Sequence, residues 1–360
     1  MIVIIVGGQY GGEGKGKLTN MLARNATLVA RAGGPNSGHT FETPDGQFTK
    51  VRMVPSATGH DRVRLAIGPG ALIDPLVLRR EIEEFGLTPR RLTIDPQAYI
   101  IQPEDPAAET KIKAQISSTG TGTGAAAARR IMQRTTDEVA PLARKEAWLA
   151  PFLGDVPDLI NDVAQHGNVL VEGTQGFGLS LFHGAYPFVT SRDTTAAAVC
   201  SELGISPLQV NAVILVTRTF PIRVGGPSGP LANEINWDDV TGISGSSFKI
   251  REYTTVTNKL RRVGMFDASL VRRAMLINGP TVMSLMHLDY LDTCCTNMAD
   301  YGALPEHVRE WVSKREEELS CNFAILGTGP RNDAAIVRMD LIPHSLRTWF
   351  STGRARRLSA

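Results

Sequence analysis

The sequence predicts an α/β fold: a single large domain with a mostly parallel central sheet, helices on both faces and a P-loop-like phosphate loop after the first strand. Short apolar runs alternate with helical patterns along the 360 residues, and this alternation is typical of a parallel sheet. Glycine-rich or polar motifs follow several of the apolar runs. Because ligands bind beyond the carboxyl ends of strands in such sheets, we expect one composite site for several ligands there.

The individual elements follow from composition and periodicity. Short runs rich in apolar and β-branched residues predict strands. These runs lie at 2–6, 63–67, 169–172, 210–216, 282–286 and 322–326. Apolar residues at helical spacing predict helices. These segments are 15–24, 77–86, 126–134, 156–166, 267–277 and 305–319. Without a repeat or a low-complexity linker, we expect one elaborated domain over 1–345 and a short basic tail over 346–360.

Composition excludes several classes of protein. An apolar share of 42% with 21% charged residues is ordinary for a folded protein and argues against disorder. The net charge of +2 gives no reason to expect a nucleic-acid partner. No apolar stretch approaches the roughly 18 residues of a membrane span. The four cysteines show no paired metal spacing, so we expect buried thiols and a cytoplasmic location.

A glycine-rich loop separates the first predicted strand from the first predicted helix. Residues 7–17 read GGQYGGEGKGK. Glycines let backbone N–H groups close around an anion, and a helix N-terminus adds a favourable dipole. The spacing of Gly11 and Gly16 is that of a Walker A loop, but Leu18 stands where its hydroxyl would be. The segment therefore predicts a phosphate loop of a different kind.

Three further polar segments are dense in groups that bind substrates. Residues 31–40 are rich in groups that contact phosphate and base, and His39 among them suits a proton donor or charge stabiliser. Residues 117–124 form a second phosphate-type loop, and the arginines at 129–130 suit a monophosphate. Residues 254–262 combine hydroxyls with cations, which favours a small dicarboxylate because arginine binds carboxylates through paired hydrogen bonds.

The order of these motifs resembles the adenylosuccinate synthetase family. That family's opening loop, GxQWGDEGKGK, corresponds to residues 7–17. Its later motifs NAGHT, TTGRGIGP, EGAQG, HGTYPYVTS, TKLD and STGP correspond to residues 36–40, 118–125, 172–176, 183–191, 286–289 and 327–330. The matches run in order over nearly the whole chain.

The resemblance implies a ligase with two chemical steps. A nucleoside triphosphate phosphorylates the 6-oxygen of a purine nucleotide, and the amine of L-aspartate then displaces phosphate at C6. It implies Mg²⁺ as the cofactor and a homodimer in which an arginine reaches across. The implied catalytic residues are His39, Lys15 and Gln175.

The resemblance also implies binding residues for each ligand. The purine monophosphate would contact Gly12, Asn36, Ser118, Thr119, Arg129, Arg130, Gln175, Thr190 and Lys259. The triphosphate would contact Gly11, Glu13, Gly14, Lys15, Gly16, Gly38, His39, Thr40, Arg261, Asp289, Gly327, Thr328, Gly329 and Pro330. L-Aspartate would contact Thr255, Val256, Thr257, Asn258, Arg261 and Arg262. The metal ion would meet the Gly38 carbonyl and the position of Gly12.

One departure from the family bears on the substrate. The aspartate of the family's opening loop is both the base at N1 and a magnesium ligand, and Gly12 stands in its place. Three interpretations follow: a nucleotide-binding pseudoenzyme, a conventional enzyme for IMP and GTP whose base is displaced, for example to Glu13, and an enzyme for a 2-amino purine. We favour the third, because removing the side chain opens room for the amine.

The favoured interpretation resembles the phage branch of the family, the 2-aminoadenylosuccinate synthetases. It predicts dGMP as the acceptor, with GMP as a variant, and a product destined for diaminopurine DNA. His287 replaces the lysine of the family's guanine-reading motif while Asp289 is kept, which favours ATP or dATP as the donor. For a viral protein the location would be the host cytoplasm.

Overall fold

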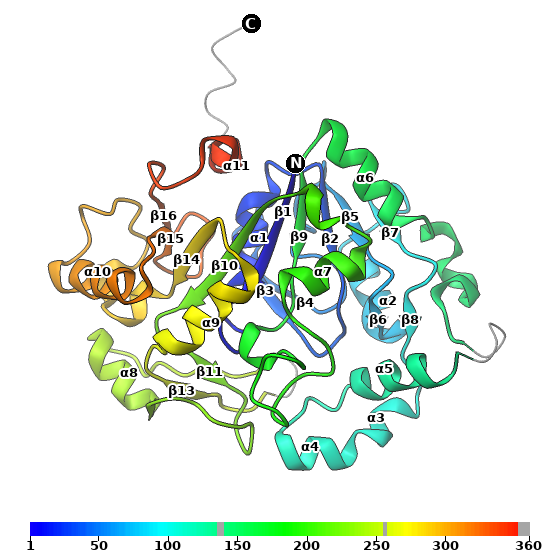
Figure 1. Cartoon of the computed structure of the whole chain (residues 1–360), viewed down its shortest axis with the longest axis horizontal. Helices are drawn as coiled ribbons and strands as arrows, with labels where there is room; N and C mark the ends of the chain where they lie inside the picture. Colours follow the sequence, from blue (N-terminus) through cyan, green and yellow to red (C-terminus); the bar gives the residue numbers. More distant parts are fainter. Residues whose placement is uncertain (135–139, 255–257, 352–360) are drawn as a thin grey trace, which may run out of the picture.

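The computed structural model describes residues 1–134, 140–254 and 258–351. Within them a nine-stranded sheet runs through the middle of the molecule, with helices on both faces (Figure 1). The strand order is β16-β15-β14-β10-β1-β9-β2-β5-β7, and neighbours pair in parallel except β15 with β16. The predicted α/β fold is therefore confirmed.

The strands of the central sheet are short. They are β1 (Ile2–Gly7), β2 (Leu28–Arg31), β5 (Arg64–Ile67), β7 (Leu92–Ile94), β9 (Val169–Glu172), β10 (Val210–Arg218), β14 (Val282–Met286), β15 (Phe323–Gly327) and β16 (Ala335–Val337). Three small sheets are built from β3 (His39–Glu42) with β4 (Phe48–Val51), β6 (Leu72–Ile73) with β8 (Tyr99–Ile100), and β11 (Ile222–Arg223) and β12 (Glu234–Ile235) with β13 (Arg262–Gly264).

The helices join and cover these strands. They are α1 (Lys15–Ala23), α2 (Pro75–Glu84), α3 (Asp105–Ala108), α4 (Thr110–Ile116), α5 (Thr123–Met132), α6 (Val156–His166), α7 (Ala196–Leu203), α8 (Trp237–Ser244), α9 (Ala268–Asn278), α10 (Glu306–Leu319) and α11 (Arg347–Phe350). Among the described residues no helix combines the length and the apolar character that crossing a membrane requires.

The core lies in two layers, one on each face of the sheet. Successive side chains of a strand point to opposite faces, so Ile2, Ile4 and Val6 of β1 enter the layer under α6, α7, α9 and α10. Val3 and Ile5 of the same strand enter the layer under α1, α2 and α11. A strand buried on both faces reads as a continuous apolar run, which is why β1 was evident from the sequence.

Strand β1 occupies the middle of the sheet. It pairs with β10 on one side and with β9 on the other, and the chain leaves it through residues 8–14 to enter α1. The loops that follow these neighbouring strands therefore meet at one edge of the sheet. This is the edge at which open α/β sheets bind their ligands.

All six predicted strands and all six predicted helices are present, with ends that differ by a few residues. The sequence analysis missed β2, β7 and β16 of the central sheet, because runs of three or four residues carry little periodicity. It also missed α7 and α8. Residues after 345 continue into α11, where Trp349 and Phe350 are buried against the core; the boundary at 345 stays a prediction.

Candidate functional site

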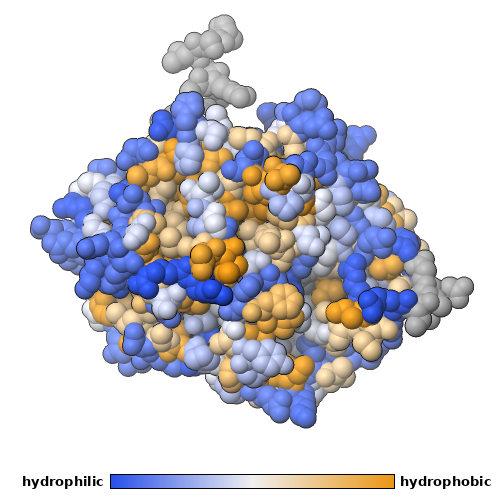
Figure 2. Space-filling model, in the orientation of Figure 1, coloured by the Kyte–Doolittle hydropathy of each residue, from blue (hydrophilic) through white to orange (hydrophobic). Residues whose placement is uncertain are grey.

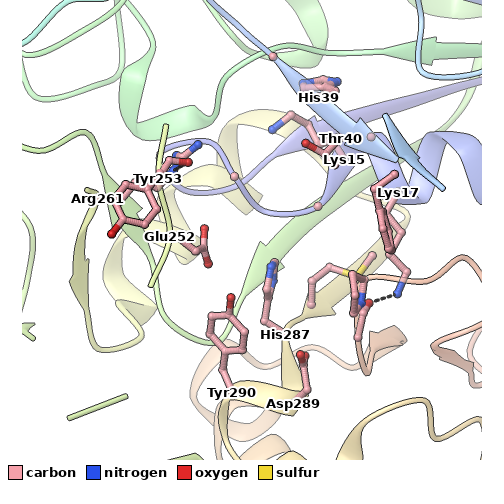
Figure 3. A pocket seen from close by; sticks show the side chains of 18 residues that line it. Lys15, Lys17, His39, Thr40, Glu252, Tyr253, Arg261, His287, Asp289 and Tyr290 are labelled. Carbon is pink, nitrogen blue, oxygen red and sulfur yellow. Dashed lines mark hydrogen bonds between the residues drawn. The ribbon is translucent and has the colours of Figure 1, made fainter. Parts of the chain in front are cut away.

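Two adjacent cavities lie at the carboxyl edge of the sheet, and Arg261 lines both. The first has a volume of about 370 Å³ and is walled by the loop after β1, strand β3 and the loops after β14 and β15 (Figure 3). The second has a volume of about 130 Å³. It is walled by segments 116–119 and 188–190 together with residues such as Tyr10, Asn36 and Gln175.

The phosphate loop is braced from within by a buried carboxylate. Glu13 accepts hydrogen bonds from the backbone N–H groups of Gln9 (3.1 Å) and Gly11 (2.8 Å). Its other oxygen pairs with Lys15 Nζ at 2.7 Å. Helix α1 begins at Lys15, so its free N–H groups and dipole favour an anion in the first cavity. Because three donors hold Glu13 inside the loop, it stabilises the loop's shape.

His39 is held by a second buried carboxylate. Its Nδ1 lies 2.6 Å from Oε1 of Glu172, the last residue of β9. The other Glu172 oxygen accepts from the Ser56 backbone N–H and pairs with Arg31. Burial raises the pKa of Glu172, but His39 and Arg31 outweigh it and lower that pKa to about 2, and burial lowers the pKa of His39. An ionised carboxylate only accepts, so Nδ1 carries the proton and Nε2 keeps a lone pair.

Arg218 holds the phosphate loop through its buried side chain. This last residue of β10 is fully buried and donates from Nη1 to the Gly12 carbonyl at 2.8 Å. Its guanidinium also pairs with Glu252 and lies over the Tyr290 ring, 5.7 Å from the centroid. Burial raises the pKa of Glu252, but Arg218 lowers it to about 2, so the pair is ionised. The side-chain amide of Gln9 bonds both backbone groups of Arg218, which ties the loop to β10.

The far end of the first cavity presents two polar atoms without protein partners. Among the described residues, His287 Nδ1 and Asp289 Oδ1 are buried and make no hydrogen bond. Burial lowers the pKa of His287 to about 3, with Arg218 adding to the effect, and burial raises the pKa of Asp289. Nearby, Lys17 Nζ donates to the carbonyls of Gly329 and Ala334. Buried polar groups in proteins normally have hydrogen-bond partners. The neutral histidine and the carboxyl group are therefore placed to bind the polar edge of a ligand.

Neutral groups dominate the second cavity. Asn36 Nδ2 donates to Thr190 Oγ1 at 3.3 Å. The amide nitrogen of Gln175 and the amide oxygen of Asn36 are buried and have no hydrogen-bond partner among the described residues. Arg223 lies over the Tyr10 ring and donates to the Phe188 carbonyl. The cavity therefore offers hydrogen-bonding amides and hydroxyls, with Arg223 and Arg261 as its cations.

Gly12 stands in the wall of the first cavity with a left-handed backbone, φ +70°. A Cβ atom built on it would lie 2.6 Å from Ile222 Cδ1 and 3.4 Å from Arg261 Nη1. The space to which its side chain would point is therefore filled by Ile222. Any room gained for a ligand lies on the cavity side of the loop.

Comparison of the sequence with known proteins identifies the family to which this chain belongs. A family model for adenylosuccinate synthetase matches residues 4–148 and 132–296. The adenylosuccinate synthetase of Methanocaldococcus jannaschii is 39% identical over 337 residues, which cover 91% of this chain and 94% of that protein. That of Thermococcus onnurineus is 39% identical over 349 residues, covering 94% and 99%. The chain belongs to the adenylosuccinate synthetase family. It is accordingly a C–N ligase of the adenylosuccinate synthetase type.

Solved structures agree with this family assignment. A fully ligated adenylosuccinate synthetase from Plasmodium falciparum superposes with a TM-score of 0.79 over 93% of this chain and 99% of its own, at 22% identity, which supports the fold alone. The succinoaminodeoxyadenylate synthetase of cyanophage S-2L, bound to dGMP and dATP, superposes with a TM-score of 0.77 over 94% and 95%, at 26% identity. Adenylosuccinate synthetases bind a purine nucleotide, a nucleoside triphosphate and aspartate.

Most of the residues predicted for the ligands lie in the two cavity walls. Those in the first are Gly12, Gly14, Lys15, Gly16, Gly38, His39, Thr40, Arg261, Asp289, Gly329 and Pro330. Those in the second are Asn36, Ser118, Thr119, Gln175, Thr190 and Arg261. Gly11, Glu13, Gly327 and Thr328 line neither cavity. Each residue's role stays a prediction.

Two predicted phosphate partners, Arg129 and Arg130, line neither cavity. Arg129 pairs with Glu104 and Asp105 of its own chain. Arg130 donates to the Pro69 carbonyl at 2.9 Å. The Arg129 pairs form because α5 packs against α3, a contact between neighbouring helices that the sequence analysis did not anticipate.

The predicted aspartate segment is described in part. Residues 255–257, which hold the predicted contacts Thr255, Val256 and Thr257, lie outside the described residues. Asn258 and Lys259 are exposed and line neither cavity. Arg262 pairs with Glu234 across the small sheet, which leaves Arg261 as the described member of this segment that faces the cavities.

Sequence reasoning assigned no role to several residues of the site. Glu172 appeared only as part of a motif, although a carboxylate that ends a buried strand was a signal. Arg218 likewise ends the apolar run of β10. Glu252, Tyr290 and Arg223 carried no local signal, because their partners lie far away in the sequence.

The donor set for a metal ion is sparse. No group of three or more His, Cys, Asp or Glu side chains suited to a metal occurs among the described residues. The Glu13 carboxylate is engaged by three donors, and Gly12 has no side chain. Because Mg²⁺ keeps several waters and binds mainly substrate phosphates, these residues fit an ion carried by a triphosphate. The contact at the Gly38 carbonyl stays a prediction.

Proposed function

We propose that this chain condenses L-aspartate with dGMP at C6, driven by ATP or dATP, to give 2-amino-2′-deoxyadenylosuccinate for diaminopurine DNA. The observation that carries the proposal is Gly12. Where the family has a carboxylate, this chain has a bare backbone beside Arg261, the residue shared by the two cavities. A carboxylate side chain there would crowd a purine that bears an amine next to N1.

The first cavity suits the triphosphate. Its inner end combines the N-terminus of α1 with Lys15, which favours phosphate. Its far end holds His287 and Asp289, each with a buried polar atom that has no hydrogen-bond partner among the described residues. A neutral His287 accepts or donates a single hydrogen bond and adds no charge beside the base, and Asp289 accepts from an exocyclic amine. An adenine edge, with one amine and one ring acceptor, matches this pair.

The second cavity suits the nucleoside monophosphate. Asn36, Gln175 and Thr190 supply the amides and hydroxyl that a 6-oxo purine and its sugar need. Ser118 and Thr119 supply further hydroxyls from the segment after α4. With Arg223 and Arg261 as its cations, the cavity balances the single phosphate that this substrate carries.

His39 supplies the proton transfer that the absent carboxylate would have performed. Its Nδ1–H is held by Glu172, and Nε2 has no partner among the described residues. Nε2 takes the proton from purine N1 as the 6-oxygen bonds to the terminal phosphorus and the nucleoside diphosphate leaves. Lys15 and Arg261 offset the charge on the transferring group. Bound Mg²⁺ would neutralise phosphate charge beside the Gly38 backbone.

The neutral amine of aspartate then attacks C6, phosphate leaves with the proton that His39 returns to it, and the new secondary amine releases its extra proton to solvent. Arg261 presents a planar fork suited to a carboxylate of the amino acid. Its position between the cavities keeps that carboxylate near the reacting carbon. The proposal also assigns residues 255–257, which the sequence analysis predicts as contacts of L-aspartate, to the binding of this amino acid.

The proposal includes a homodimer with an arginine that reaches across. Apolar side chains gather in the middle of one face of the molecule, framed by hydrophilic ones (Figure 2). Phe182 and Tyr186, in the segment between β9 and α7, are exposed next to the second cavity's wall at 188–190. Because Arg129 is held by Glu104 and Asp105, Arg130 is the better candidate for the crossing residue.

A conventional reaction of IMP with GTP is the second candidate. The observation that favours it is identity: the archaeal adenylosuccinate synthetases match at 39%, above the 26% of the cyanophage protein. Asp289 is also compatible with guanine, whose N1–H and 2-amino group both donate.

The two candidates separate in one assay. Purified full-length protein with aspartate and Mg²⁺ is given IMP, GMP or dGMP, each with ATP, dATP or GTP. Phosphate release and product mass are measured, and EDTA provides the metal-free control. We expect turnover with dGMP and an adenine donor. Turnover confined to IMP with GTP would overturn the proposal, as would nucleotide binding without turnover in any combination.

A further inference from the structure

Three glycines of the phosphate loop have left-handed backbones, but they differ in what a side chain would meet. At Gly11 (φ +88°) the nearest atom to a built Cβ lies 3.8 Å away. At Gly14 (φ +96°) Met286 Cγ lies at 3.2 Å. At Gly12 (φ +70°) Ile222 Cδ1 lies at 2.6 Å and Cγ1 at 3.3 Å. Backbone strain is therefore common to all three positions, and a severe side-chain clash is particular to Gly12.

Ile222 has little freedom to move away. It belongs to β11 and pairs with Val263 of β13. Its side chain is fully buried in the core layer of α7 and α9. The next residue, Arg223, is anchored by bonds to the Phe188 and Pro230 carbonyls. Since packed cores resist added volume, a side chain at position 12 would have to displace a methyl group that has no empty space to enter.

The contact lies behind the wall that separates the cavities. Gly12 lines the first cavity, and Arg261, 3.4 Å from the same built Cβ, lines both. The Gly12 carbonyl is fixed by Arg218 at 2.8 Å, so the peptide has one orientation. Ile222 is fully buried and lines neither cavity, so its methyl group supports this wall from the core side.

We propose that Ile222 is a specificity-determining residue. Its Cδ1 methyl occupies the space that a side chain at position 12 would need and so keeps a carboxylate out of the wall between the cavities. Positions 12 and 222 are therefore coupled, so the effect of a substitution at one position depends on the residue at the other. The statement that the coupling favours dGMP over IMP rests on the proposed function. The coupling between the two positions does not depend on it.

A double-mutant cycle tests the coupling. Ile222→Val removes only the Cδ1 methyl, so it is combined with Gly12→Asp in the full-length protein. The readouts are kcat/KM with dGMP and with IMP and the melting temperature. We expect Gly12→Asp to lower kcat/KM for dGMP about tenfold or more. We expect the double variant to exceed the product of the single effects by about fivefold or more, within the usual range for contacting residues.

The preference between the two nucleotides distinguishes an effect on specificity from an effect on stability. In the double variant the ratio of kcat/KM for IMP to that for dGMP should rise at least about fivefold over the unsubstituted chain, because a carboxylate can now enter the wall. A loss of packing alone would lower both values together and leave the ratio unchanged. An unchanged ratio would therefore overturn the role in specificity.

Gly11→Asp is the matched control. It carries the same backbone strain with free space at 3.8 Å, so Ile222→Val should not rescue it. Equal rescue at both positions, or additive effects at position 12, would overturn the proposal. Should Gly12→Asp fail to fold, Gly12→Ala with Ile222→Val repeats the cycle. If the unsubstituted chain uses IMP alone, the proposed function fails, while the cycle is still read from IMP turnover and melting temperature.

Discussion

The two cavities share Arg261 but differ in charge. The first gathers Lys15, His39, Glu252 and Asp289 around the N-terminus of α1. The second is walled mainly by amides, hydroxyls and apolar groups. A triphosphate needs concentrated charge to be held and transferred, whereas a purine edge is distinguished by the pattern of neutral donors and acceptors around it. Under the proposed function, catalysis depends on the first cavity and discrimination of the acceptor depends on the second.

His39→Ala is expected to give the largest effect. Loss of a group that transfers a proton lowers kcat by about 10²–10⁴-fold, and the KM of either nucleotide should change little because binding contacts remain. Phosphate release under saturating substrates measures it. His344→Ala, which changes an exposed histidine, serves as the control. A loss of kcat below tenfold would mean that another group moves the proton.

His287→Gln should alter the pH dependence of stability. Burial lowers the pKa of His287 from 6.5 to about 3, so below pH 6.5 the unfolded chain binds a proton that the folded chain does not, and stability falls as pH falls. Between pH 7 and pH 5 this costs roughly 1–2 kcal/mol, a loss that the variant should escape. Urea unfolding at both pH values measures it. Thr190→Val, in the second cavity, should keep the dependence of the unsubstituted chain.

Thr190→Val and Thr40→Val form a reciprocal pair. Each replaces a hydroxyl by a methyl of similar shape, one in the second cavity and one in the first. A lost hydrogen bond of about 0.5–1.5 kcal/mol should raise KM roughly two- to tenfold for the monophosphate with Thr190→Val and for the triphosphate with Thr40→Val. Steady-state kinetics with each nucleotide varied in turn measures both. Effects on the opposite nucleotides would reverse the assignment of the cavities.

Arg129→Ala should have the smallest effect on the kinetics. Arg129 pairs with the buried Asp105 and with the exposed Glu104, so its removal leaves a buried carboxylate unpaired and should lower stability rather than nucleotide binding. We expect the KM for dGMP to stay within about twofold. Arg130→Ala, compared in the same assay, should raise it further if Arg130 crosses to the partner's cavity. A larger effect of Arg129→Ala would identify Arg129 as that residue.

Much of the first cavity was predictable because its residues follow strand ends. The loops after β1, β14 and β15 carry their signals within a few residues: glycines and lysines at 7–17, His287 with Asp289, and Gly329 with Pro330. Parallel strands bring such loops to one edge whatever the order of the chain. The second cavity was less predictable, since Tyr10, Arg223 and Phe188 meet through connections that leave the sheet.

By itself the sequence determined the α/β class, the order of the phosphate and base motifs, and the absence of a carboxylate at Gly12. These are local properties, because a strand end or a glycine-rich turn is encoded by neighbouring residues. Only the tertiary structure decided that Glu172 holds His39, that Arg218 fixes the Gly12 carbonyl and that Ile222 fills the space beside Gly12. Each of these contacts joins residues more than a hundred positions apart, and only the packing of strands around β1 brings them together.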